Sequence, residues 1–148
     1  MSDPHTNTAT VEIDAPPDAV FPWLADSGRR CEWMSALVES EPLTNGPLQV
    51  GSRFRDVFED YGKRVELEAE LVDVDPPWCQ TVRLEAKSFE ATSSQRLEAV
   101  DGGTRLTAVI ETRYTSRAGR LLASVVTRHA QARLESDLAR LKRLVESA

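Results

Sequence analysis

Side chains that commonly hold metal ions are scarce in this sequence, which has two histidines and two cysteines among its 148 residues. Cys31 and Cys79 are far apart in the sequence and form no CxxC motif, and His5 and His129 lie near neither of them. A zinc site built from histidine and cysteine is therefore not expected. The sequence predicts two reduced, mostly buried thiols, with a disulfide left open because its geometry cannot be tested from sequence.

Motifs that bind nucleotides or build hydrolase active sites are also missing. The sequence contains no GxGxxG loop and no GxxxxGK loop followed by serine or threonine, and Gly102-Gly103 has the character of a hairpin turn. It contains no GxSxG elbow and no HExxH helix. We therefore expect no cofactor and no metal ion.

Long apolar runs are absent as well. The longest nearly apolar run, residues 121–126, is interrupted by Ser124 and is far shorter than the roughly 20 residues of a membrane-spanning helix. The first ten residues, MSDPHTNTAT, have neither the basic start nor the apolar stretch of a secretory signal. We expect a cytoplasmic protein without membrane insertion.

The charge of the chain is negative overall, with 18 Lys and Arg against 24 Asp and Glu, yet basic residues gather after position 112. Such asymmetry is typical either of a nucleic-acid surface or of a basic helix lying on an acidic sheet. Acidic residues alternate with the basic ones in this segment, and no aromatic residue follows Tyr114. Both features disfavour a surface that tracks phosphates and stacks bases, so we expect no nucleic-acid binding.

Hydropathy periods predict one α+β domain over residues 8–148, after a disordered tail at residues 1–7. A first strand is expected at 9–13, followed by a short helix that starts at Pro16-Pro17 and a second short helix at 29–34. Runs that alternate in polarity, separated by turn residues such as Asn45-Gly46 and Asp101-Gly102, then predict an antiparallel meander. Its strands are expected at 38–43, 52–58, 63–74, 80–86, 89–100 and 104–114.

A long amphipathic helix is expected at residues 116–146, where apolar side chains recur every three or four positions. The alternation in the strands leaves one face of the sheet wet, and this helix is the element that can cover the other face. The predicted architecture is a curved antiparallel sheet wrapped around a long C-terminal helix, with two short helices after the first strand.

The order of several segments resembles the SRPBCC superfamily, also called START-like or Bet v 1-like, and most closely its polyketide cyclase/dehydrase branch of small bacterial proteins. The segments that carry the resemblance are VEIDAPPDAVFPWLAD followed by Trp33, then VGSRF, VDVDPP, DGGTRLT and the basic C-terminal helix. The resemblance implies a helix-grip fold with an elongated apolar cavity between sheet and helix. Members bind lipids, sterols, polyketides or hormones, and some catalyse cyclisation or hydrolysis, but they share no catalytic motif.

Several polar side chains are expected to face that cavity. Asp56 shares a strand face with Phe54 and Phe58, so it points inward as a candidate acid or base, or else lies hydrated at a strand end. His129 borders the expected cavity on the long helix, either as a packed side chain or as a base. The candidate catalytic residues are Asp56, His129 and Tyr114.

The expected ligand-binding residues combine inward strand positions with the long helix and with Trp33, which either packs on the core as a lid or contacts the ligand. Ser93, Gln95 and Tyr114 supply hydrogen bonds to an otherwise apolar ligand, unless they satisfy one another or bind a buried water. The full set is Trp33, Phe54, Phe58, Leu67, Leu84, Ser93, Gln95, Ile110, Thr112, Tyr114, Val125 and His129.

The function expected from these features is binding of a hydrophobic small molecule, lipid-like, polyketide-like or aromatic, in an internal cavity. Cyclase- or aromatase-like chemistry in that cavity is a further option, because the fold hosts both carriers and enzymes. The alternative is a partner-binding module related to the co-chaperone members of the fold, without small-molecule chemistry. The protein is expected to act as a monomer or a homodimer.

Overall fold

The computed structural model describes residues 5–60 and 62–148, apart from the side chains of residue 60 and of residues 121–127. The described residues form one antiparallel sheet with the strand order β1-β7-β6-β5-β4-β3-β2. This confirms the predicted meander, since each strand from β2 to β7 pairs with the next one along the chain. The strands are β1 (His5–Ile13), β2 (Leu37–Pro42), β3 (Arg53–Asp60), β4 (Lys63–Asp75), β5 (Cys79–Glu85), β6 (Phe89–Val100) and β7 (Gly103–Tyr114).

The first strand begins earlier than the sequence indicated. β1 starts at His5, which pairs with Thr112 of β7, whereas we expected a strand from residue 9 and a disordered tail up to residue 7. The polar residues at 5–8 hid this strand from a hydropathy pattern, but the sheet register extends along them, and Asn7 is buried. The assignment of residues 8–148 to a single domain stays a prediction.

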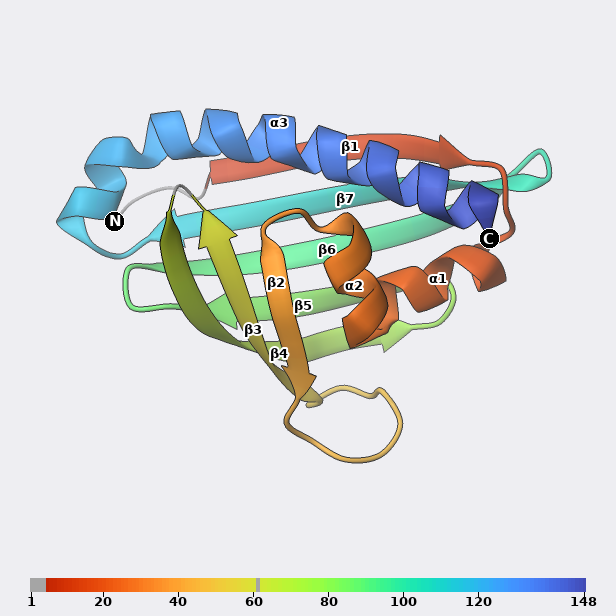
Figure 1. The fold of residues 1–148 in the computed structure, drawn as a ribbon, viewed down its shortest axis with the longest axis horizontal. Coiled ribbons are helices and arrows are strands. Elements are labelled where there is room, and N and C mark those ends of the chain that lie inside the picture. The colour runs from red at the N-terminus through yellow and green to blue at the C-terminus, as the bar shows by residue number, and fades with distance from the viewer. Residues whose placement is uncertain (1–4, 61) are drawn as a thin grey trace.

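Two short helices connect β1 to β2. α1 (Pro17–Ala25) begins with a proline. Proline suits the first turn of a helix because it lacks the backbone N–H, which has no partner there. α2 (Ser27–Trp33) follows at once, and the Asp26 side chain caps it by accepting a hydrogen bond from the Arg29 backbone N–H at 2.9 Å. Figure 1 shows α1 near the end of the sheet where α3 ends, and α2 closer to the middle of the sheet, beside β2.

The C-terminal segment is a single helix, α3 (Arg117–Ser147), as predicted. The Ser116 hydroxyl caps it by accepting a hydrogen bond from the Gly119 backbone N–H at 3.0 Å. In Figure 1 the helix runs along β1 and β7, while β2 and β3 slope steeply across β5 and β6, so the sheet curves beneath the helix. Among the described residues, no helix is both long and apolar enough to cross a membrane.

The core lies at the C-terminal half of α3, where the helix meets α1, α2 and the strands β1, β6 and β7. Leu138 and Leu141 of α3 are 1% and 0% exposed there. The core consists of Ile13, Val20, Phe21, Leu24, Trp33, Leu97, Leu106, Ala108, Leu134, Leu138, Leu141 and Val145. Packing is therefore dense at this end of α3. Unfilled space between the helix and the sheet remains beneath the middle of the helix.

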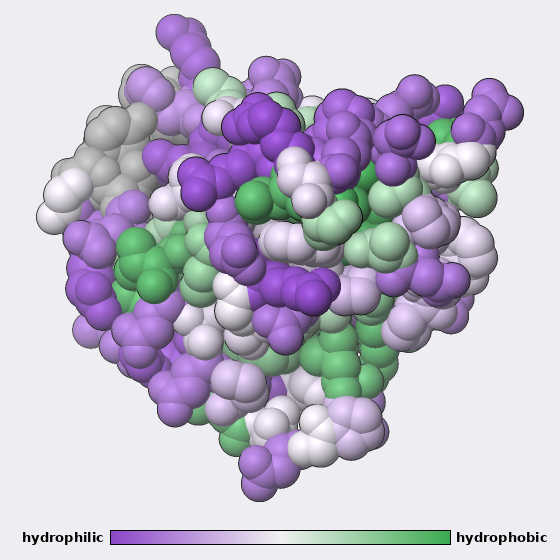
Figure 2. All heavy atoms as spheres, turned by 45° about the vertical axis from the view of Figure 1, so that its right-hand side comes forward, coloured by the Kyte–Doolittle hydropathy of each residue, from purple (hydrophilic) through white to green (hydrophobic). Residues whose placement is uncertain are grey.

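The outer face of the sheet is charged, as the alternation predicted. In β4, Leu67, Ala69 and Leu71 are buried, while Glu66 and Glu68 between them are exposed. Figure 2 shows one face of the molecule, where hydrophilic side chains predominate and apolar ones lie in separate groups.

Both cysteines are free thiols, as expected, but each is partly exposed rather than mostly buried. Burial still raises the pKa of the Cys31 thiol, and the neighbouring Arg30 opposes this effect.

Candidate functional site

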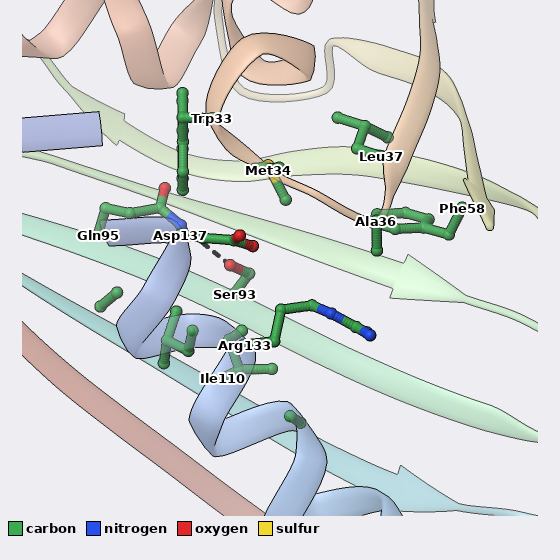
Figure 3. A pocket seen from close by; sticks show the side chains of 13 residues that line it. Trp33, Met34, Ala36, Leu37, Phe58, Ser93, Gln95, Ile110, Arg133 and Asp137 are labelled. Atoms are coloured by element: carbon green, nitrogen blue, oxygen red, sulfur yellow. Dashed lines mark hydrogen bonds between the residues drawn. The ribbon is translucent and has the colours of Figure 1, made fainter. Parts of the chain in front are cut away.

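A cavity of about 190 Å³ lies between the sheet and the middle of α3 (Figure 3). Its floor comes from β6 and β7, one wall from the segment that joins α2 to β2, and the other wall from α3. The lining is predominantly apolar and consists of Trp33, Met34, Ala36, Leu37, Phe58, Ser93, Gln95, Ala108, Ile110, Ala130, Arg133, Leu134 and Asp137. Small side chains at Ala36, Ala108 and Ala130 leave this space unfilled, because the surrounding backbone does not close over it.

A second, smaller hollow adjoins the cavity. It shares with the cavity five lining residues: Trp33, Met34, Phe58, Ser93 and Gln95. The remainder of its lining is Leu24, Arg30, Gln80, Val82 and Leu84. The shared residues place the two hollows side by side.

Trp33 is held rigidly at the junction of the core and the cavity. Its indole Nε1 donates a hydrogen bond to the backbone carbonyl of Trp23 at 2.8 Å, and its side chain is 5% exposed. The two alternatives for this residue are therefore not exclusive, since Trp33 packs in the core and also presents a ring edge or face to the cavity.

A line of hydrogen-bonded polar side chains crosses the floor of the region. Gln80 of β5 lies directly opposite Gln95 of β6, and its Nε2 donates to Gln95 Oε1 at 2.9 Å. Gln95 Nε2 in turn donates to Ser93 Oγ at 2.9 Å. Ser93 and Gln95 thus satisfy each other in part, as one alternative foresaw, and Gln80 is a buried member of the line that the sequence analysis missed.

Asp137 is the main residue of the site that the sequence analysis missed. It lines the cavity, is 8% exposed, and its Oδ1 accepts a hydrogen bond from the Ser35 backbone N–H at 3.2 Å. Burial raises the pKa of the Asp137 carboxyl, and the hydrogen bonds from Ser35 and the charges of Arg133 and Arg140 oppose this effect. A carboxyl in the lining of a cavity can exchange a proton with a bound molecule.

A signal for Asp137 does exist in the sequence. On α3 the residues that face the sheet include Ala130, Leu134, Leu138 and Leu141, which are spaced by three or four positions. Asp137 lies three positions after Leu134 and four before Leu141, so it occupies the apolar stripe of the helix. We counted it among the charges that alternate along the helix, whereas a charged residue on an apolar stripe marks a buried site.

Asp56 is buried in the middle of β3 and not hydrated at a strand end. Its side chain is fully buried, and its Oδ2 accepts a hydrogen bond from the Arg30 guanidinium at 2.8 Å. Its Oδ1 accepts from the Ser40 hydroxyl at 2.7 Å. Asp56 does point to the concave side of the sheet, but it is engaged by α2 and β2 and does not line the cavity, so its interactions are those of a structural ion pair.

The predicted binding residues divide by their distance from the two hollows. Trp33, Phe58, Ser93, Gln95 and Ile110 line the cavity, and Leu84 lines the smaller hollow. Their part in binding stays a prediction. The remaining predicted strand residues, Phe54, Leu67, Thr112 and Tyr114, lie outside both linings.

The curvature of the sheet explains why these four residues lie away from the two hollows. Phe54 of β3 and Leu67 of β4 are buried, at 8% and 5% exposure, outside both linings. Thr112 is half-buried on β7, and the ring of the half-buried Tyr114 meets His5 edge-on and lies tilted against Phe89. All four residues face the concave side of the sheet. The cavity occupies only part of that side, so the alternation of polarity alone does not locate it.

The helix residues expected at the cavity also differ from the structure. The His129 side chain is exposed, whereas Ala130, one position further along, faces the cavity. One position corresponds to about 100° around a helix, which turns His129 away from the sheet. The side chain of Val125 lies outside the described residues.

Metal binding has no geometric support in the part of the chain that the structure describes. No three His, Cys, Asp or Glu side chains there lie close enough together to hold a metal ion. Among the described residues, the lining of the cavity offers two carboxylate oxygens, from Asp137, and no imidazole or thiolate. Such a set suits hydrogen bonding and proton exchange with an organic molecule.

Solved structures with the same fold cover almost the whole chain. The protein TTHA0849 from Thermus thermophilus is 22% identical, with a TM-score of 0.81 over 96% of this chain and 97% of that one. The ZhuI aromatase/cyclase from Streptomyces sp. R1128 is 20% identical, with a TM-score of 0.77 over 97% and 94%. Ara h 8.0201 is 15% identical, with a TM-score of 0.70 over 98% and 99%.

These similarities show that the fold is the predicted helix-grip of Bet v 1-like proteins. A search of curated proteins found no match. A model of the family described as "Polyketide cyclase / dehydrase and lipid transport" matches residues 4–146, nearly the whole chain. The chain therefore belongs to the polyketide cyclase/dehydrase and lipid transport family.

Proposed function

We propose that the protein binds a small, largely apolar molecule in the cavity between α3 and the sheet. The observation that carries this proposal is the cavity itself, an apolar space with a few converging polar groups, which is the usual character of ligand sites. The family and the fold add support, because both are associated with hydrophobic ligands. At about 190 Å³ the cavity is smaller than the roughly 300–1,000 Å³ of sites for drug-sized ligands, so its ligand has one or two rings.

Filling the cavity tests this proposal. Ala108→Trp and Ala130→Phe each place a large side chain in the space that the ligand needs. We expect either change to weaken binding of the neutral two-ring fluorescent dye 1-aminonaphthalene by about tenfold or more, a loss of about 1.4 kcal/mol of binding free energy. Dye fluorescence titrations measure the affinity.

Ala132→Phe is the matched control, since Ala132 is exposed on the same helix. It adds the same side chain outside the cavity and is expected to leave the affinity unchanged. Ala130→Phe is included because Ala108 is only 2% exposed, so a tryptophan there strains the core. Equal dye affinity in the wild type and in a folded Ala130→Phe variant would contradict the proposed site.

Catalysis in the same cavity is a second candidate function, and the observation that favours it is Asp137. Cyclase- or aromatase-like chemistry needs a group that moves protons, and the raised pKa of this carboxyl suits it to that task. Asp137 is the carboxylate of the described lining, which also contains the hydrogen-bonding side chains of Ser93 and Gln95. A carrier needs no such buried acid.

Asp137→Asn separates the two functions because it keeps the shape of the side chain and removes its proton exchange. Native mass spectrometry of protein purified from its own host identifies the bound molecule, which is then incubated with the wild type and the variant. For an enzyme we expect conversion by the wild type and a rate about 10²- to 10⁴-fold lower in the variant. For a carrier, both proteins return the molecule unchanged.

The other expectations stay predictions. They are that the protein binds no nucleic acid, works in the cytoplasm and is a monomer or homodimer. The partner-binding alternative would need a continuous exposed apolar surface. The exposed large apolar residues are Val38, Leu43, Val50, Val65 and Trp78.

A further inference from the structure

The hydrogen bonds on the cavity floor run in one direction, and a backbone carbonyl sets that direction. Gln80 Nε2 donates one hydrogen bond to the Leu24 carbonyl and the other to Gln95 Oε1, both at 2.9 Å. A carbonyl oxygen only accepts, so Gln80 must present its amide nitrogen at this position. Gln95 then receives a donor at its oxygen and must present its own nitrogen to Ser93.

Ser93 is the last member of this line, and it is left with a proton to donate. Its Oγ accepts the hydrogen bond from Gln95 Nε2 at 2.9 Å. Its cross-strand neighbours are Val82 on β5 and Ile110 on β7, whose side chains accept no hydrogen bond. Within residues 5–60 and 62–148, the side chains of residue 60 and of residues 121–127 excepted, no acceptor is found for the Ser93 hydroxyl, and the side chain lines both hollows. The hydroxyl proton is therefore available to an occupant of the cavity.

The positive charges near the cavity are already balanced. Arg30, beside the smaller hollow, is ion-paired with the buried Asp56 at 2.8 Å. Arg133, which lines the cavity, lies close enough to Asp137 to act on the pKa of its carboxyl. The described lining thus has no surplus positive charge that would repay the desolvation of an anionic ligand.

We propose that the cavity receives a small cyclic molecule with a neutral acceptor oxygen, such as a ketone, and that this oxygen accepts a hydrogen bond from Ser93 Oγ. This inference rests on the proposed function, because it names the class of ligand for the same cavity. Gln80 and Gln95 act as positioning residues, since they hold the Ser93 oxygen as an acceptor and so turn its proton toward the ligand. Trp33, Phe58 and Ile110, which line the cavity together with Ser93 (Figure 3), then contact the ring system.

Three bicyclic probes of similar size test this inference: 1-tetralone, tetralin and tetralin-1-carboxylate. Their affinities are measured by displacement of 1-aminonaphthalene from the wild type and from Ser93→Ala. We expect Ser93→Ala to weaken binding of 1-tetralone about 3- to 10-fold, the usual effect of one neutral hydrogen bond. Tetralin, which has no acceptor, should bind both proteins equally. The carboxylate should bind the wild type more weakly than the ketone does.

Ser94→Ala is the matched control, because Ser94 lies on the other face of β6 and its hydroxyl pairs with that of Thr81 at 3.2 Å. It should change none of the three affinities. Unchanged affinity for 1-tetralone in Ser93→Ala, or an equal loss for tetralin, overturns the inference and leaves the cavity function intact. Preference for the carboxylate overturns the neutral class of ligand. Failure of the wild type to bind both tetralin and 1-tetralone overturns the inference together with the proposed function.

Discussion

Replacing Leu141 by alanine is expected to lower the free energy of unfolding by about 2–5 kcal/mol, and Leu138→Ala by a similar amount. These side chains are 0% and 1% exposed, and they lie in the densely packed half of the molecule. The change removes buried apolar surface and also leaves a cavity that the two short helices and the sheet cannot close. Urea denaturation followed by circular dichroism measures the effect.

Leu43→Ala is the control for this prediction. Leu43 is 48% exposed, so the same change in side chain removes little buried surface and should cost less than about 1 kcal/mol. A loss below about 0.5 kcal/mol for Leu141→Ala would show that this face of α3 does not pack on the sheet.

The strands were predictable because two independent signals agreed for them. β6 was placed at 89–100 and is observed as Phe89–Val100, since its alternation ends at Asp101-Gly102, where both residues have positive φ. A left-handed turn of this kind favours glycine and aspartate, so composition and polarity marked the same boundary. The start of β1 carried neither signal, because its pairing with β7 depends on register and not on hydropathy.

The cavity was predictable as a feature but not in its exact place. Alternation assigned Phe54, Phe58 and Leu67 to one face, and all three do lie on the concave side, yet only Phe58 lines the cavity. Which part of a face remains open depends on where α2 and α3 cross it. That crossing is set by tertiary packing between segments more than 90 residues apart, such as the Ser35–Asp137 hydrogen bond.

Charged residues were the hardest to interpret from sequence. Asp137 and Asp56 are both buried. Asp137 is bonded to Ser35, which is remote in the sequence, and Asp56 of the sheet is paired with Arg30 of helix α2. A carboxylate has no hydropathy signature that separates a solvated position from a paired buried one. Only the periodicity of the neighbouring apolar residues indicates the difference, as it does on α3.

The second large effect is expected at the buried ion pair between α2 and β3. Asp56→Ala should lower the free energy of unfolding by about 3–5 kcal/mol, because it leaves the Arg30 guanidinium without its carboxylate. Arg30 is 12% exposed, and its remaining partner is the Ser40 hydroxyl at 3.2 Å. A single hydroxyl does not replace the two charge-assisted hydrogen bonds that Asp56 accepts.

The exposed pair Arg83–Glu70 provides the comparison, since Arg83→Ala should cost less than about 1 kcal/mol at the solvated face of the sheet. The double variant Arg30→Met with Asp56→Leu then separates the effect of the two charges from the effect of the volume that the side chains fill. It removes both charges and keeps apolar volume, so it should recover most of the stability lost in Asp56→Ala. Urea denaturation of the three variants decides the matter: a double variant as unstable as Asp56→Ala would mean that the pair fixes the position of α2 over the cavity, and not merely that an unpaired charge is costly.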